Sequence, residues 1–372
     1  MGFLSSEVPQ DQIEQRGAEF SNFMKQRVGL VNRKLDEFFN EENSEHYFKR
    51  VLERSGYEFD TDALVEGVIK PVKYLVELGG KRVRALMTML SMEALGVDSA
   101  NYVEFAIIPE TIHNGTLVHD DVQDNSDMRR GAKALHKVYG LDMALNVGDI
   151  LYFITMPMLD VSRKIDDGTK RRISSEYMKR MLGLGVGQAT DIVWHRQMLD
   201  VFSITEDQYL RVVFDKTGAL LGFAAKLGAL IAKADDDTVS SFGKLGNAIG
   251  VSFQIQDDIL NIGGGKVAEN KGGAGEDITE GKVTLLVVHA LHSLPESKAK
   301  RLASILKEHT KDKGKIGEAI ALIEESGATD YARKRSAAII SEAWDGLRKR
   351  LPDGKEKAYI AAMLDMLLSR ES

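Results

Sequence analysis

The sequence predicts an all-α protein built from ten or more helices. Runs in which apolar residues recur at i, i+3, i+4 and i+7 are more frequent than runs of alternating apolar and polar residues. Only 6 prolines interrupt the 372 residues, and no long stretch of alternating β-branched residues occurs. The composition, 43% hydrophobic and 28% charged, is that of an ordinary soluble globular protein.

Three long segments carry the helical pattern most clearly: residues 19–39, 67–96 and 207–232. Because no Pro-, Gly- or Ser-rich linker divides the chain, we expect one domain over residues 21–372 and a loosely ordered segment over residues 1–20. The glycine-rich stretch after residue 262 is expected to be a mobile loop of a site rather than a linker. The predicted loops are residues 96–101, 164–169, 232–238, 263–275 and 311–314.

Charge and cysteine content exclude several classes of protein. A formal net charge of −7 gives no indication of binding to nucleic acid or anionic membranes, and the absence of cysteine excludes disulfides and thiolate nucleophiles. The first thirty residues carry charges throughout and lack the apolar core of a signal peptide. The apolar stretches 144–161 and 218–232 are interrupted by charges or proline, so we expect buried helices, no membrane-spanning segment and a cytoplasmic protein. Gly2 and Ser6 match a myristoylation pattern that is short enough to arise by chance.

An acidic motif occupies residues 119–131, with the sequence HDDVQDNSDMRRG. In a helix, Asp120 and Asp124 lie about 40° apart around the axis and one turn apart along it, with Asp121 beside them. The preceding residues 105–118 are mostly apolar, so this helix face is expected to point inward. Two stacked carboxylates suit a hard cation, although a single cluster of this kind is more often a solvated helix surface.

A second cluster, FQIQDDILN over residues 253–261, places Asp257, Asp258 and Asn261 at the same spacing. Their first aspartates, Asp120 and Asp257, are 137 positions apart, so the motifs are not one run of surface charge. If their helices face each other, their oxygens can surround a shared cavity. No histidine or cysteine lies at ligand spacing, and ligation by oxygen alone favours Mg²⁺ over zinc. Because protein-bound Mg²⁺ commonly takes phosphate oxygens as further ligands, a phosphorylated ligand is implied.

Basic residues accompany both motifs. Arginine forks and lysine point charges are the usual protein ligands of a diphosphate. Each one alone is more often a surface charge, but together they suggest two anion sites, one bridged by metal and one held by cations only. Lys81 and Arg84 are three residues apart and are expected on one helix face. The candidates are Lys81, Arg84, Arg129, Arg130, Lys216 with the neighbouring Thr217, Lys271 and Lys282.

In this order the motifs resemble the trans-type (head-to-tail) isoprenyl diphosphate synthases, in particular geranylgeranyl and polyprenyl diphosphate synthases. The resemblance runs from about Lys81 to Lys282 and extends over the chain after residue 20. It implies a single-domain helical bundle around a deep apolar cavity (the isoprenoid synthase fold), two or three Mg²⁺ ions and a homodimer. The chain departs from the family pattern at Asn261, where an aspartate usually closes the second motif, and at Ala85, where proline is common.

The resemblance also implies roles for individual residues. Arg129 and Lys216 would stabilise the departing diphosphate and so act catalytically. His113, seven residues before Asp120 and thus on the same helix face, would bind isopentenyl diphosphate, although alone it would be taken for a core histidine. The implied metal ligands are Asp120, Asp121, Asp124, Asp257 and Asp258. The implied ligands of the allylic diphosphate are Arg129, Lys216, Thr217, Gln254, Lys271 and Lys282, and those of isopentenyl diphosphate are Lys81, Arg84, His113 and Arg130.

The implied reaction is ionisation of an allylic diphosphate (dimethylallyl, geranyl or farnesyl) and attack on the cation by isopentenyl diphosphate, with release of diphosphate. Gly115 and Thr116 are small where farnesyl-type enzymes tend to carry aromatic residues, which predicts geranylgeranyl diphosphate or a longer product. Phenylalanine at either position should shorten it. Two alternatives remain: a class I terpene cyclase, which needs no second diphosphate site, and a non-catalytic subunit of a heteromeric synthase, which would tend to lose acidic residues.

Overall fold

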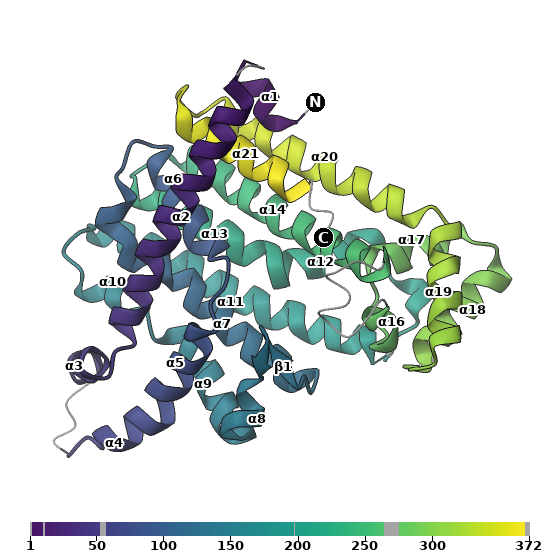
Figure 1. Ribbon diagram of the computed structural model, residues 1–372, viewed down its shortest axis with the longest axis horizontal. Helices are drawn as coiled ribbons and strands as arrows, with labels where there is room; N and C mark the ends of the chain where they lie inside the picture. The colour runs from purple at the N-terminus through teal and green to yellow at the C-terminus, as the bar shows by residue number, and fades with distance from the viewer. Residues whose placement is uncertain (1, 10–11, 53–56, 197, 264–274, 369–372) are drawn as a thin grey trace. The chain divides into compact units, whose positions relative to one another are not determined.

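The computed structural model describes residues 2–9, 12–52, 57–196, 198–263 and 275–368, and this part of the chain is almost entirely helical (Figure 1). The all-α prediction is confirmed. The strands among these residues are the two-residue β1 (Met128–Arg129) and β2 (Ala132–Lys133), which pair antiparallel in a small hairpin. The predicted mobile loop lies largely in residues 264–274, outside the described residues.

The chain forms two compact units, which are described separately. Unit 1 comprises residues 1–16, 176–223 and 235–372, and unit 2 comprises residues 17–175 and 224–234. Three of the boundaries fall inside helices, in α2 (Ile13–Phe38), α11 (Asp167–His195) and α13 (Ala219–Ile231). The single domain expected from the sequence stays a prediction.

Unit 2 is built around α7 (Val103–Gln123), which packs against α6 and α9. The helix is apolar over most of its length, and Phe105, Ile108, Ile112 and Val118 are almost completely buried. Burial on several sides fixes the direction in which the last turn of α7, with its aspartates, leaves the core. The other elements of this unit are α2 (Ile13–Phe38), α3 (Glu41–Val51), α4 (Thr61–Leu64), the π-helical η2 (Val65–Ile69), α5 (Lys70–Glu77), α6 (Val83–Glu93), the 3₁₀ turn η3 (Ser99–Tyr102), α8 (Leu135–Tyr139), α9 (Leu141–Phe153) and α10 (Pro157–Val161).

Unit 1 is built around α14 (Asp236–Gly263), which packs along α20 (Figure 1). A Cβ atom at Gly250 would lie 2.6 Å from the Cα of Gly218, so glycine allows α14 to approach the π-helical η5 (Phe214–Gly218) closely. This contact places the basic segment of η5 beside the acidic motif of α14. The other elements are α1 (Phe3–Glu7), η4 (Val201–Ser203), α12 (Glu206–Val213), α16 (Glu276–Thr279), α17 (Leu285–Ser293), α18 (Glu296–Lys307), α19 (Lys313–Glu325), α20 (Ala328–Arg348) and α21 (Lys355–Leu368).

Part of the N-terminal segment expected to be loosely ordered has defined contacts within unit 1. The backbone N–H of Phe3 donates to Asp365 Oδ1 at 2.6 Å, which joins α1 to α21. Glu7 is 8% exposed at its side chain and pairs with Arg348 at 3.2 Å and with Lys357 at 3.4 Å. The two ends of the chain are therefore connected by hydrogen bonds and ion pairs.

The helical segment expected over residues 67–96 is interrupted after α5. Gly79, Gly80 and Arg82 have positive φ angles of 76°, 143° and 50°, a conformation that ends one helix and redirects the chain before the next. Lys81 consequently precedes α6, which begins at Val83 and carries Arg84. The prediction that Lys81 and Arg84 share a helix face was wrong, because side-chain periodicity does not reveal the left-handed residues between α5 and α6.

One stretch in the described residues, Leu141–Val161, is long and apolar enough to cross a membrane. About half of it is buried in the protein (44%), and it is divided between α9 and α10 by a turn. A core helix of a soluble protein meets the same criterion, as the sequence led us to expect here.

Candidate active site

The first acidic motif ends α7, and its spacing is the predicted one. The N–H of Asp124 donates to the carbonyl of Asp120 at 2.9 Å, so the two residues lie one turn apart. Asp121 differs from them because its carboxylate is 1% exposed and accepts from Arg129 Nε at 2.9 and 3.0 Å, with a further bond from Nη2. The hairpin of β1 and β2 carries Arg129 back to this carboxylate, a pairing that spacing along one helix could not predict.

The donor set of the first motif consists of carboxylate oxygens, which fit a magnesium ion. Asp121 binds the Arg129 guanidinium with both oxygens, and Asp120 and Asp124 lie one helical turn apart beside it. Oxygen ligands of this kind suit Mg²⁺, which takes one or two carboxylates and fills its shell with water and phosphate. Among the residues that the structure describes, no three His, Asp or Glu side chains are clustered closely enough to hold a metal by themselves.

A cluster of arginines lies at the start of α6 in the same unit. Arg84 is near Arg130, and burial, opposed by the charge of Glu110 and aided by that of Arg130, lowers the pKa of Arg84 to about 10. Glu110, 2% exposed, supplies the countercharge, and its Oε1 accepts from the backbone N–H groups of Arg84 at 3.0 Å and Ala85 at 3.1 Å. It therefore caps the helix that carries Arg84. The sequence analysis missed Glu110, although a lone glutamate inside an apolar run marks a buried charge that needs a partner.

His113 lies on α7 beside this arginine cluster. Burial lowers its pKa well below the usual 6.5, and the charges of Arg84, Arg130 and Arg129 lower it further. Since a charged imidazole is disfavoured among fixed cations, His113 is neutral at pH 7 and keeps one ring N–H to donate. The structure thus brings three of the four residues implied for one diphosphate, Arg84, His113 and Arg130, into one electrostatic group.

In unit 1, Lys216 and Thr217 of η5 form contacts with polar side chains of α11 and α14. Lys216 pairs with Asp191 of α11, and Thr217 Oγ1 donates to Gln254 Oε1 at 3.3 Å. A Cβ atom at Gly187 would lie 2.8 Å from the Cβ of Asp215, so α11 also approaches η5 closely. Sequence reasoning missed Asp191, because nothing in the spacing along the chain relates it to Lys216.

The second acidic motif is part of a hydrogen-bonded network. Asp258, 4% exposed, accepts from the Tyr209 hydroxyl at 2.7 Å and from Gln254 Nε2 at 2.9 Å. Burial, with a contribution from nearby Asp277, raises the pKa of Asp258 to about 7. Both oxygens of Asp258 therefore accept hydrogen bonds from side chains of the protein. Tyr209 and Asp277 were not identified from the sequence.

Residues that follow the second motif in the sequence form hydrogen bonds and ion pairs beside it. The amide oxygen of Asn261 accepts from the N–H of Asp277 at 3.2 Å and so caps the first turn of α16. Lys282 pairs with Asp277 at 3.4 Å and with Glu280, so this lysine lies beside the motif as the sequence suggested. Lys271 lies outside the described residues.

The two residues predicted to set product length have different surroundings. A Cβ atom at Gly115 would lie 2.8 Å from the carbonyl oxygen of Gly148 and 3.0 Å from the Tyr152 ring, so α7 and α9 touch there. Thr116 is half-buried, and its hydroxyl donates to the His113 carbonyl at 2.8 Å. Gly115 thus has a packing role, and the effect of either residue on product length stays a prediction.

Comparison with known proteins relates this arrangement to one family. A family model described as polyprenyl synthetase matches residues 65–323, well over half of the chain. The chain belongs to the polyprenyl synthetase family. The match contains all the acidic and basic residues of the candidate active site.

Individual relatives support this assignment. A geranylgeranyl pyrophosphate synthase from Geoglobus acetivorans is 31% identical over 357 residues, which cover 94% of this chain and 99% of the relative. A short chain isoprenyl diphosphate synthase from Methanothermobacter thermautotrophicus is 32% identical, covering 84% and 93%. The crystal structure of a geranylgeranyl pyrophosphate synthetase from Pyrococcus horikoshii superimposes with a TM-score of 0.79 at 28% identity, covering 95% of this chain and 99% of that one.

The protein is therefore a trans-prenyltransferase with the isoprenoid synthase fold, as its motifs predicted. The family match begins at Val65, within η2, and ends at Ile323, within α19. Among the described residues, helices α1 to α4 precede the matched region, and α20 and α21 follow it.

Replacing Glu110 with alanine is expected to lower the free energy of unfolding by about 2 kcal/mol, because two backbone N–H groups and a buried guanidinium lose their acceptor and countercharge. Urea unfolding followed by circular dichroism measures this loss. Glu104→Ala on the same helix is a matched control, since Glu104 forms a partly exposed pair with Lys164 at 2.6 Å worth less than about 1 kcal/mol. Equal losses in both variants would contradict the capping role.

Acidification from pH 7 to pH 5 is expected to destabilise the prenyltransferase more than a His113→Gln variant. The folded state holds the pKa of His113 below 6.5, whereas the unfolded chain takes up a proton near that value. The unfolded state then binds more protons, so the stability is present above pH 6.5 and is lost as the pH falls below it. Unfolding free energies of both proteins at the two pH values test this, and identical pH dependences would show that His113 titrates normally.

Proposed function

We propose that this trans-prenyltransferase condenses isopentenyl diphosphate with an allylic diphosphate to give geranylgeranyl diphosphate or a longer polyprenyl diphosphate, releasing diphosphate. The observation that carries the proposal is the pairing of Asp121 with Arg129 beside Asp120 and Asp124. This arrangement offers two carboxylates for a metal and one fixed guanidinium for the same phosphate group. A cluster of cations without metal ligands, around Arg84, offers the second diphosphate site.

The magnesium ions expected from the family would be held by Asp120 and Asp124 in the first motif and by Asp257, with Asp258, in the second. When bound, they would supply positive charge to the diphosphate leaving group. Family membership implies this requirement in general, and the oxygen-only donors of both motifs suit Mg²⁺.

The leaving group is proposed to be stabilised by two fixed cations, Arg129 and Lys216. Arg129 is held by the carboxylate of Asp121, and Lys216 is held by the carboxylate of Asp191. Cations that are fixed before the substrate binds need little reorganisation as charge develops on the diphosphate. This preorganisation is the main source of electrostatic catalysis. Thr217 and Gln254 lie beside Lys216, bonded to each other, and are proposed to bind the same diphosphate.

The attacking substrate is proposed to bind at Lys81, Arg84, His113 and Arg130. Arg84 and Arg130 supply permanent charge, and the neutral imidazole of His113 supplies an N–H donor without adding a charge among the arginines. Holding isopentenyl diphosphate by its diphosphate leaves its double bond free to attack the allylic cation. The proton lost in the last step is proposed to go to the departed diphosphate, so no covalent nucleophile is required.

We also propose a cytoplasmic homodimer. Met178, Leu182 and Val186 recur every four residues on α11, and each is more than half exposed. A row of exposed apolar side chains on one helix face is typical of a surface that is covered by another subunit. In unit 2, Phe153 of α9 is likewise a large apolar side chain that is 59% exposed.

The proposed activity is tested by incubating the protein with radiolabelled isopentenyl diphosphate, farnesyl diphosphate and MgCl₂, followed by chromatography of the dephosphorylated products. We expect chain extension that stops with EDTA and resumes with excess Mg²⁺. Asp120→Asn is expected to lower kcat/KM by at least about 100-fold, because the metal loses a ligand at the leaving group.

A matched control is Asp142→Asn, an exposed aspartate at the start of α9 whose carboxylate accepts the N–H of Met143. It is expected to leave turnover unchanged. A cyclised hydrocarbon from the allylic substrate alone would instead identify a terpene cyclase. No turnover, together with activity restored by a co-purified partner chain, would identify a non-catalytic subunit.

Thr116→Phe is expected to shorten the main product by one isoprene unit or more, since one helical turn of about 5.4 Å matches an extended isoprene unit. Gly115→Phe is a poor test of the same idea, because a side chain there collides with the backbone of Gly148 and separates α7 from α9. We expect that variant to show a lowered Tm. Product sizing of folded Thr116→Phe decides the question, and an unchanged product profile would remove Thr116 from the cavity floor.

A further inference from the structure

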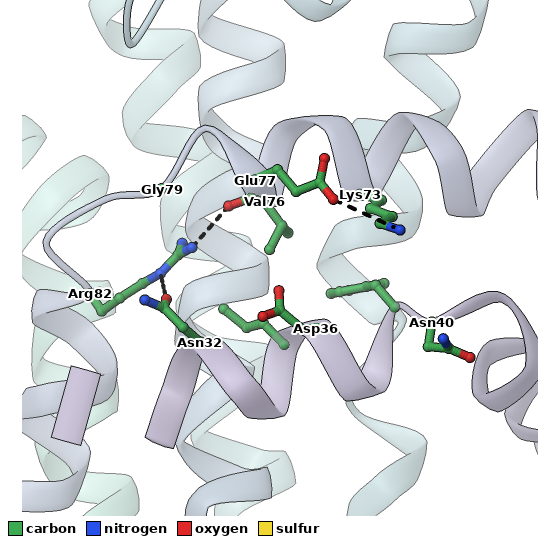
Figure 2. A pocket seen from close by; sticks show the side chains of 10 residues that line it. Asn32, Asp36, Asn40, Lys73, Val76, Glu77, Gly79 and Arg82 are labelled. Atoms are coloured by element: carbon green, nitrogen blue, oxygen red, sulfur yellow. Dashed lines mark hydrogen bonds and ion pairs between the residues drawn. The ribbon is translucent and has the colours of Figure 1, made fainter. Parts of the chain in front are cut away.

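Arg82 lies between Lys81 and Arg84, two residues proposed to bind isopentenyl diphosphate, but its side chain makes contacts of another kind. It is 4% exposed, and Nε donates to Asn32 Oδ1 at 2.9 Å while Nη2 donates to the carbonyl of Val76 at 3.0 Å. Figure 2 shows these two bonds, which connect the loop after α5 to α2 and to α5 itself. With two of its three nitrogens bound to protein acceptors, Arg82 is oriented by the fold and not by a ligand.

The loop that carries these bonds needs an external anchor. Arg82 adopts φ of 50°, and the glycines at positions 79 and 80 also have positive φ, so regular helical hydrogen bonding does not run through this segment. A residue other than glycine is strained in the left-handed region and persists there where its surroundings hold it. The hydrogen bonds of the Arg82 side chain fix the loop to α2 and α5. The hydrogen bond from the backbone N–H of Arg84 to Glu110 fixes the start of α6.

A pocket of about 550 Å³ opens beside this anchor, lined by Asn32, Asp36 and Asn40 on one side and by Val76 and Arg82 on the other (Figure 2). Asn32 is half-buried at its edge. If Asn32 is shortened, water can enter from the pocket and solvate the guanidinium, so the change does not leave a charge sealed in an apolar core. The anchor can therefore be broken in a protein that still folds.

We propose that Arg82 and Asn32 form an anchor that positions the loop of residues 79–82, and with it Lys81 and Arg84, for binding isopentenyl diphosphate. Arg82 acts as a positioning residue and touches no substrate. This inference rests on the proposed function of Lys81 and Arg84. It adds a residue of α2, outside the region matched by the family model, to the determinants of that site.

A competing explanation is that Arg82 only adds positive charge near the diphosphate. Lysine at this position keeps the charge but lacks the planar fork that reaches Asn32 and Val76 together. Asn32→Ala removes one acceptor and leaves the net charge of the protein unchanged. The two variants together separate geometry from charge.

The experiment is steady-state kinetics of Arg82→Lys and Asn32→Ala with each substrate varied in turn. We expect the KM for isopentenyl diphosphate to rise about tenfold in both, the size expected for loss of one hydrogen bond to a charged group. The KM for the allylic substrate and kcat should stay within about twofold. Asn32→Asp keeps an acceptor for Arg82 Nε and should restore the KM.

Asn40→Ala is the matched control. Asn40 lines the same pocket, but its Oδ1 accepts from the N–H groups of Glu42 at 3.1 Å and Asn43 at 3.4 Å, as the cap of α3. It should lose stability without a change in KM for isopentenyl diphosphate. Arg84→Ala tests the underlying site: if it raises this KM while Arg82→Lys and Asn32→Ala do not, the anchor is overturned. If Arg84→Ala itself has no effect, the assigned site fails and the inference fails with it.

Discussion

Pairing of fixed cations with carboxylates of the same unit is the interaction on which the site depends. Arg129 is held by Asp121, Lys216 by Asp191, and the arginines at the start of α6 face Glu110. Each pairing offsets the cost of removing a cation partly from water and fixes its side chain in one position. The carboxylates therefore keep in place the cations that are proposed to bind diphosphate.

This constraint divides the acidic residues into two kinds that look alike in the sequence. Asp121 and Asp258 are buried and accept hydrogen bonds from side chains of the protein, so they support the fold of the site. Asp120 and Asp124 carry the one-turn spacing that suits a metal ion. The first aspartate-rich motif thus combines the proposed ligands of a cation with a residue that orients the neighbouring arginine.

The helical bundle supplies the rigidity that these pairs need. Glycines allow α14 and α11 to approach η5 at backbone distance, and Gly115 lets α7 approach α9. Close helix contacts leave little freedom for the side chains that project from them. The same packing explains why a change at Gly115 would disturb the fold before it could report on product length.

The fold class of this prenyltransferase and the spacing of its acidic motifs could be determined from the sequence alone, because helical periodicity and i, i+4 spacing are local properties of the chain. Asp120, Asp124 and Asp257 were identified as candidate metal ligands in this way. The tertiary structure decided what depends on residues distant in sequence: the pairs of Asp121 with Arg129 and Lys216 with Asp191, and the cap formed by Glu110. It also decided that Lys81 precedes α6, since left-handed residues leave no mark in apolar periodicity.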